Sequence, residues 1–183
     1  MKFTLTAVAL TGLISSASAQ YFGVIAAHST APIHLQPLAA NGEHIWIGKK
    51  TSSYCPKAQV GKACPKGKFT TFAGGEKTLG MGAIVPGGQQ VYIDPTCGAL
   101  QYTIAHSASM PEGAIVTGWS IEQGESFGTL SWKNGLLACP VGDAEEGPWK
   151  VYGKLKGIKY SKDCLGFDAL TTNSTKASAW QYT

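Results

Sequence analysis

The residues that could carry out nucleophilic chemistry are two serines that each follow a histidine. Ser29 follows His28, and Ser107 follows His106. Neither serine stands in a G-x-S-x-G turn, the turn that exposes the nucleophile of many hydrolases. We therefore interpret these residues as ordinary strand or loop residues and predict no catalytic residue among them.

Two close pairs of acids could serve a glycoside hydrolase. They are Glu122 with Glu125 and Glu145 with Glu146. A glycosidase needs two carboxyl groups that face each other across a cleft, one of them in an apolar setting that raises its pKa. Both pairs fall in turn-rich sequence, so solvated loop carboxylates are the better interpretation. The sequence predicts no enzyme, and a glycan hydrolase is the weaker alternative.

A metal site would need the four histidines, or several cysteines, to converge. No two histidines stand at a ligand spacing such as H-x-x-x-H. Cys55 and Cys64 stand nine residues apart and lack the paired C-x-x-C knuckles of a structural zinc site. The sequence therefore predicts no metal and no cofactor.

The elements that must position these residues are short strands. Between residues 118 and 166, apolar residues alternate with polar ones, as in Trp119 and Ile121, which is the period of a half-buried strand. Turn sequences separate the runs, and Asn134-Gly135 is the strongest hairpin signal. Strands are expected at residues 21–27, 33–38, 44–48, 68–72, 90–94, 99–104, 118–122, 129–132, 136–139 and 149–152, and around 167–170 and 179–182.

These runs predict a single all-β domain over residues 20–183. About twelve short strands in hairpin-like units suit a closed barrel of β-trefoil-like type, in which the first and last strands pair and no long edge is exposed. The internal repeat is spaced like hairpins rather than like whole trefoil units. A two-sheet β-sandwich is therefore the alternative.

The first residues predict export. Lys2 precedes an apolar run over residues 7–14, and Ala17-Ser18-Ala19 stands before Gln20. This pattern is typical of a secretory signal peptide, here residues 1–19. No later apolar run approaches the roughly 20 residues that a bilayer crossing needs, so we expect a soluble exported protein without membrane association.

The charged residues bear on the class of partner. The chain has 15 basic residues, all of them lysine, and 11 acids. Arginine binds phosphate bidentately and reads guanine, so its absence argues against a nucleic-acid partner. Lysines gather between Lys150 and Lys162 and could favour an anionic surface, but a solvated face is the better interpretation.

Five cysteines in an exported chain predict disulfides and leave one thiol over. The favoured pair is Cys139 with Cys164, because the bridge closes a loop of about 26 residues and would contribute about 3–4 kcal/mol by the loop-entropy model. Cys55 with Cys64 is the second choice, which leaves Cys97 free. An exchange of Cys97 with Cys55 or Cys64 stays an open alternative.

A modification site is predicted near the C-terminus. Asn173-Ser174-Thr175 matches the acceptor sequence for N-glycosylation and stands in a polar stretch before the last expected strand. We therefore predict a glycoprotein with its glycan at Asn173.

Five short motifs follow the signal peptide in order. They are Tyr21-Phe22-Gly23-Val24-Ile25-Ala26-Ala27-His28-Ser29, Leu35-Gln36-Pro37, Gly118-Trp119-Ser120-Ile121, Ala138-Cys139-Pro140 and Cys164-Leu165-Gly166-Phe167. Together they resemble the PhiA family of secreted fungal cell-wall proteins, over about residues 21–170. The resemblance implies a wall-associated or secreted protein linked to the development of phialides and conidia, and some relatives are discussed as antigens. It supplies no catalytic residue, so we expect a non-enzymatic role in wall architecture.

The alternatives to this role are a lectin-like module that docks on cell-wall polysaccharide, such as chitin or β-glucan, and a secreted effector. Strand alternation directs Trp46, Tyr92 and Tyr152 outward, because the residues on either side of them face inward. An exposed aromatic ring can stack on a sugar, so these three are predicted ligand contacts. Sheet surfaces also favour aromatic residues for cross-strand packing alone.

Overall fold

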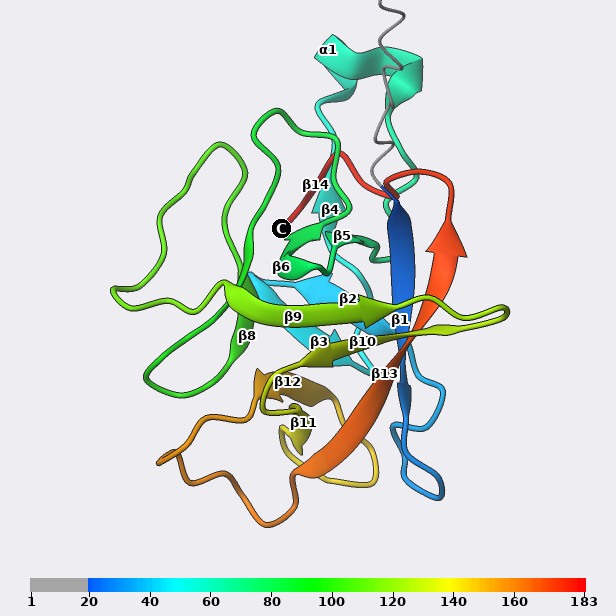
Figure 1. Ribbon diagram of the computed structural model, residues 1–183. Helices are drawn as coiled ribbons and strands as arrows, with labels where there is room; N and C mark the ends of the chain where they lie inside the picture. Colours follow the sequence, from blue (N-terminus) through cyan, green and yellow to red (C-terminus); the bar gives the residue numbers. More distant parts are fainter. Residues whose placement is uncertain (1–19) are drawn as a thin grey trace, which may run out of the picture.

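The computed structural model describes residues 20–183, and the predicted signal peptide, residues 1–19, lies outside the described residues. The regular structure of the described chain consists of antiparallel strands joined by turns and loops, with one four-residue helix and one 3-10 turn (Figure 1). The prediction of an all-β fold is confirmed.

The described part of the chain contains fourteen strands and two short helical turns. The strands are β1 (Tyr21–Ala27), β2 (Leu38–Asn41), β3 (His44–Ile47), β4 (Ser53–Tyr54), β5 (Phe72–Gly74), β6 (Lys77–Met81), β7 (Val91–Ile93), β8 (Leu100–Tyr102), β9 (Thr117–Glu122), β10 (Gly128–Trp132), β11 (Leu136–Pro140), β12 (Trp149–Gly153), β13 (Leu165–Ser174) and β14 (Gln181–Tyr182). The helical turns are α1 (Lys57–Val60) and the 3-10 turn η1 (Gly61–Ala63).

Twelve of the strands form one large sheet, and β4 and β14 pair separately. Six strands are paired in a circuit that returns to its start, β1–β5–β6–β9–β10–β13–β1. The ten-residue strand β13 also pairs through its first residues with β11, which leads on to β12, β3, β8 and β7. The β-trefoil-like barrel stays a prediction.

Most of the expected strands lie where the alternation places them, but several expectations were wrong. The strand expected at 68–72 overlaps β5 only at Phe72, and the short strands β2 and β4 were not expected at their positions. Residues 31–36 form successive turns, in which His34 N–H donates to Ala31 O, because Ile33 enters the core on a turn rather than on a strand. The strand β6 was missed because Lys77, Thr78 and Gly80 interrupt its apolar pattern. The β9–β10 and β11–β12 hairpins do not pair with each other, because β13 lies between them in the sheet.

The core is built from the inward-facing residues of the strands. Trp119, Leu130, Trp132, Trp149 and Val151 all belong to one buried cluster, as their spacing predicts. The same cluster includes Tyr102 and Tyr182, whose rings meet edge to face with centroids 6.4 Å apart. The last strand is therefore part of the core.

A buried glutamine holds the C-terminal strand in place. Gln89 is 3% exposed, and its side-chain oxygen accepts a hydrogen bond from Tyr182 N–H at 2.8 Å. Its side-chain nitrogen donates to Tyr182 O at 3.0 Å and to Thr103 O at 2.9 Å. The Gln89 amide thus serves Tyr182 as a neighbouring strand would, and it leaves none of these buried groups unpaired.

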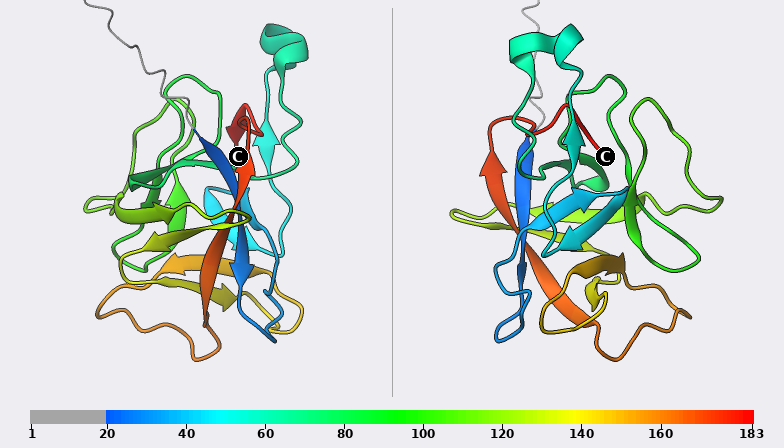
Figure 2. Two further views of the ribbon diagram at one scale, coloured as in Figure 1. Left: turned by 45° about the vertical axis from the view of Figure 1, so that its right-hand side comes forward. Right: turned by 180° about the vertical axis from the view of Figure 1, so that it is seen from behind.

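The two disulfides are the pairs that the sequence analysis favours. Cys139 on β11 is joined to Cys164 just before β13, and Cys55 is joined to Cys64 around α1. Figures 1 and 2 show α1 standing clear of the sheet, so the second bridge closes a projecting loop. Cys97 is free and exposed. Neither described helix is long or apolar enough to cross a membrane.

Replacing Gln89 should strongly destabilise the fold. In the Gln89→Ala variant the main-chain groups of Tyr182 and Thr103 lose their partner inside the core, so we expect the free energy of unfolding to fall by about 3–4 kcal/mol. The Gln59→Ala change, on the exposed face of α1, should cost less than about 0.5 kcal/mol. Urea unfolding measures both, and a loss below about 1 kcal/mol for Gln89→Ala would contradict this role.

Candidate functional site

The three predicted aromatic ligand residues lie on one face of adjacent strands. Trp46 on β3 pairs with Lys150 on β12, two residues before Tyr152. Tyr92 on β7 pairs with Gln101 on β8, which pairs in turn with His44 on β3. Because directly paired residues share a face, these side chains all lie on the side of the sheet opposite the core.

The expectation of exposed rings was nevertheless wrong for two of them. Trp46 is 8% and Tyr92 is 5% exposed. Lys49 places its ammonium group 3.7 Å from the centre of the Trp46 ring, and long lysine side chains commonly cover apolar surface in this way. Tyr152 is half-buried, with its ring against Tyr160. Contact of these three residues with polysaccharide stays a prediction.

His44 lies beside Trp46 in a cationic setting. The Lys150 ammonium group donates to His44 Nε2 at 3.1 Å, and His44 Nδ1 is buried without a partner in the described part of the chain. Burial, followed by the charges of Lys150 and Lys49, lowers the pKa of His44 from its ordinary 6.5 to about 4, although the Asp94 carboxylate opposes the shift. His44 is therefore neutral at pH 7.

A groove of about 880 Å³, here called the lysine groove, runs beside the outer face of β1. Three lysines line it, and Phe69 at its edge is 71% exposed. Of the described residues in its lining, none is Asp, Glu, His or Cys. The lining consists of Gly23, Val24, Ile25, Pro37, Leu38, Ala39, Lys49, Lys50, Thr51, Gly67, Lys68, Phe69, Thr70, Thr71, Thr172, Ser174 and Ser178.

Hydrogen bonds, buried at Thr70 and Thr71 and exposed at Phe69 itself, fix the backbone that carries Phe69. Thr70 Oγ1 accepts from Ala40 N–H at 2.8 Å, and Ser178 Oγ donates to Phe69 O at 2.6 Å. The Tyr182 hydroxyl accepts from Thr71 N–H at 2.9 Å. The Phe69 ring therefore stays outside the core while its backbone is held from both sides.

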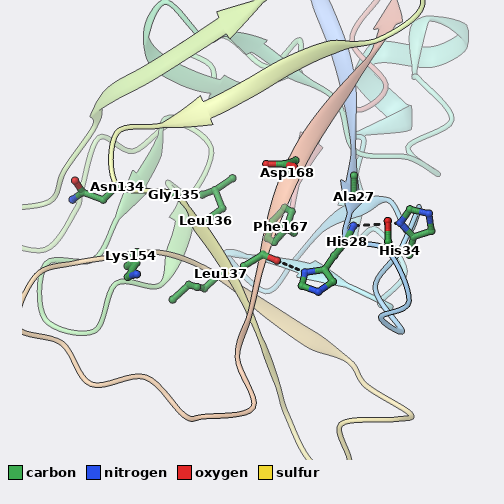
Figure 3. A pocket seen from close by; sticks show the side chains of 12 residues that line it. Ala27, His28, His34, Asn134, Gly135, Leu136, Leu137, Lys154, Phe167 and Asp168 are labelled. Carbon is green, nitrogen blue, oxygen red and sulfur yellow. Dashed lines mark hydrogen bonds between the residues drawn. The ribbon is translucent and has the colours of Figure 1, made fainter.

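A second concavity, here called the His28 pocket, has a volume of about 660 Å³ (Figure 3). It lies where the end of β1 meets the start of β11 and the first half of β13. Its lining mixes apolar, amide, imidazole, ammonium and carboxylate groups. The lining residues are Ala27, His28, Ser29, His34, Asn134, Gly135, Leu136, Leu137, Lys154, Gly166, Phe167 and Asp168.

Main-chain contacts orient the two imidazoles of this pocket. His28 Nδ1 bonds to Gly166 O, and His34 Nδ1 accepts from His28 N–H at 3.3 Å, as the dashed lines in Figure 3 show. A carbonyl can only accept, so the hydrogen of neutral His28 is on Nδ1 and its Nε2 is an acceptor. Neutral His34 has the opposite tautomer, so its Nε2–H is a donor.

The pocket does not assemble a nucleophile or a metal site. No hydrogen bond within residues 20–183 joins the Ser29 hydroxyl to either imidazole, which an activated serine requires. Asp168 is the sole carboxylate in the described lining. Over the same residues, no group of three or more His, Cys, Asp or Glu side chains is placed to hold a metal ion.

The sequence analysis missed both concavities. Neither Phe69 nor Asp168 was predicted to contact a ligand, because neither forms a recognisable binding motif with its neighbours in the sequence. A signal for the lysine groove was present: between His44 and Gly75 the chain holds six lysines and no acid. The structure places Asn173 at the exposed end of β13, and its glycosylation stays a prediction.

The matching family is described as PhiA-like secreted protein, and its model covers residues 22–183. The chain belongs to the PhiA-like secreted protein family. An uncharacterized secreted protein of Arthroderma benhamiae is 35% identical over 158 residues, 80% of this chain and 77% of the relative. Cell wall protein phiA of Aspergillus fumigatus is 24% identical over 170 residues, 90% of this chain and 85% of the relative. No solved structure matches the chain.

The PhiA-like match confirms the resemblance, and it extends past residue 170 to the last residue of the chain. The family is described as secreted, in agreement with the predicted export. The Arthroderma benhamiae relative is named as secreted, and the name of the Aspergillus fumigatus relative agrees with a location in the cell wall.

The setting of His44 predicts a loss of stability in acid. The pKa of His44 in the folded chain, about 4, lies below its ordinary value of 6.5, so the unfolded chain takes up the proton at a higher pH than the folded chain does. The contribution of His44 to the free energy of unfolding is therefore full above about pH 6.5 and declines as the pH falls toward 4. For this half-exposed ring, screened by solvent, we expect about 1–2 kcal/mol.

Urea unfolding at pH 7 and pH 4 measures this effect as the difference between the wild type and a His44→Asn variant. The His106→Asn variant, at an exposed histidine, is the control and should keep the pH dependence of the wild type. If His44→Asn also keeps it, the cationic setting does not act on His44.

Proposed function

We propose that this PhiA-like protein is a non-enzymatic component of the fungal cell wall that binds neutral wall polysaccharide, chitin or β-glucan, in the His28 pocket. The observation that carries the proposal is the chemistry of the pocket lining. It combines one carboxylate, one amide and two imidazoles with an apolar surface.

These groups match the surface of a sugar. Asp168 can accept hydrogen bonds from neighbouring hydroxyls, and such charge-assisted bonds are the strong ones. Asn134 and the Nε2 atoms of the two histidines supply further donors and acceptors. Leu137 is half-buried and lines the pocket, so it offers apolar surface to the carbon face of a sugar ring, whereas Phe167 packs partly against the core.

The same lining supports binding rather than hydrolysis. Glycoside hydrolases generally use two carboxyl groups on opposite sides of the scissile bond. Asp168 has no second carboxylate opposite it among the described lining residues. A chain bound here would be held without being cleaved, as a structural wall protein requires.

The biological part of the proposal is a role in wall architecture during the development of phialides and conidia. It rests on membership of the family and on the relatives named cell wall protein phiA. The six-strand circuit supports a rigid scaffold for this role, which we propose is a closed barrel. A rigid scaffold limits the entropy lost when a polymer binds.

Removing the carboxylate should weaken sugar binding. Asp168→Asn keeps the size of the side chain but removes its charge, so we expect affinity for chitin and β-glucan oligosaccharides to fall about 10-fold. The control is Asp163→Asn, an exposed aspartate outside the pocket, which should bind like the wild type. Calorimetry measures the affinities, and equal binding by Asp168→Asn and the wild type would remove this pocket from the proposal. Steady release of sugar from the polymers by pure protein would contradict the non-enzymatic role.

Fractionation of hyphal walls should locate the protein and define its attachment. We expect release by hot detergent, because the proposed contacts are non-covalent, and less wall-bound protein for Asp168→Asn than for Asp163→Asn. Release by glucanase alone would indicate a covalent link instead. Deletion of the gene should reduce phialide and conidium formation, and normal sporulation in the deletion strain would contradict the developmental role.

A further inference from the structure

The lysine groove shares no lining residue with the His28 pocket and differs from it in charge. Lys49, Lys50 and Lys68 line the groove, and no carboxylate lies in its described lining. Lys50 and Lys68 are exposed to solvent. An anionic ligand would therefore meet only charges of the opposite sign, with no repulsion from carboxylates in the lining.

The position of Lys49 is fixed by an aromatic contact. Its ammonium group lies 3.7 Å from the centre of the Trp46 ring, which is itself held by a hydrogen bond from Nε1 to Asn41 O at 2.8 Å. A lysine held in this way loses less conformational entropy on binding than a free surface lysine. The buried Trp46 thus acts on the groove by positioning Lys49.

Phe69 adds an apolar surface next to these charges. Its ring is 71% exposed although its backbone is fixed by Ser178 and by the neighbouring Thr70. An exposed ring on a rigid backbone is suited to stacking, and a flat sugar ring is a natural partner. The groove, at about 880 Å³, has room for more than the charged group alone.

We infer that the lysine groove binds a polysaccharide that carries carboxylate or phosphate groups, with its charges on Lys49, Lys50 and Lys68 and a sugar ring on Phe69. Carboxylate and phosphate share the chemistry that ammonium groups recognise, and both occur on polysaccharides. This inference does not rest on the proposed function, because it concerns another groove and another ligand.

Calorimetry on the mature protein tests the inference with defined polymers. The probes are polygalacturonate, its neutral methyl ester, and a phosphomannan before and after removal of its phosphate. We expect binding of at least one charged polymer, weaker binding at higher salt, and at least 10-fold weaker binding of its neutral form. The two charged polymers decide between carboxylate and phosphate, and failure of both to bind would overturn the inference.

Matched lysine variants distinguish binding in the lysine groove from non-specific attraction to the positive charge of the protein. The double change Lys50→Gln with Lys68→Gln should weaken binding about 5- to 10-fold, because each exposed ion pair contributes modestly. The control, Lys156→Gln with Lys159→Gln, removes the same charge from exposed lysines outside the groove and should have little effect. An equal loss in both double variants would show attraction to net charge only and overturn the inference.

The Phe69→Ala change tests the stacking contact without altering charge. It should weaken binding several-fold while leaving the salt dependence unchanged. Equally tight binding of single-stranded DNA of the same charge would overturn the assignment to polysaccharide. Thermal unfolding of each variant confirms that the fold is retained, since all the changed side chains are exposed.

Discussion

The C-terminal strand of this protein is held in the core mainly by buried polar side chains. The strand β14 pairs with β4 over two residues only, but Gln89 bonds both main-chain groups of Tyr182. The Tyr182 hydroxyl in turn lies within hydrogen-bonding distance of Ser178 Oγ, at 2.8 Å, and of Thr71 N, at 2.9 Å. The backbone below Phe69 is set by the same bonds, so the shape of the lysine groove depends on the packing of the chain's last residues.

The ten-residue strand β13 is the second constraint, because it places the two concavities relative to each other. Along its ladder with β1, Asp168 pairs with Ala27 at the His28 pocket, and Thr172 pairs with Gly23 at the lysine groove. Thr172 lies four residues after Asp168 in the strand, a distance of about 13 Å. The two concavities therefore lie toward opposite ends of the β1–β13 strand pair and differ in chemistry.

The sequence was most informative where alternation or export chemistry dominates. The strands around Trp119, Trp132 and Trp149, their place in the core and the two disulfides could all be predicted from spacing. The concavities could not, because Asp168 and His28 meet only when β13 pairs with β1, about 140 residues away in the chain. Alternation also predicts correctly that Trp46 lies on the outer face of the sheet. It does not predict that the ring is buried, because Lys49 covers the ring from a loop that has no periodicity.

We propose a rigid, non-catalytic scaffold that presents one site for neutral sugar at the His28 pocket. The most direct measurement is a titration of isotope-labelled mature protein with chitin and β-glucan oligosaccharides, followed by NMR amide shifts. We expect shifts that are concentrated at His28, Asn134 and Asp168, while the amides around Phe69 stay unchanged. Shifts confined to the Trp46 face or to the lysine groove, or no shift with either sugar, would contradict it.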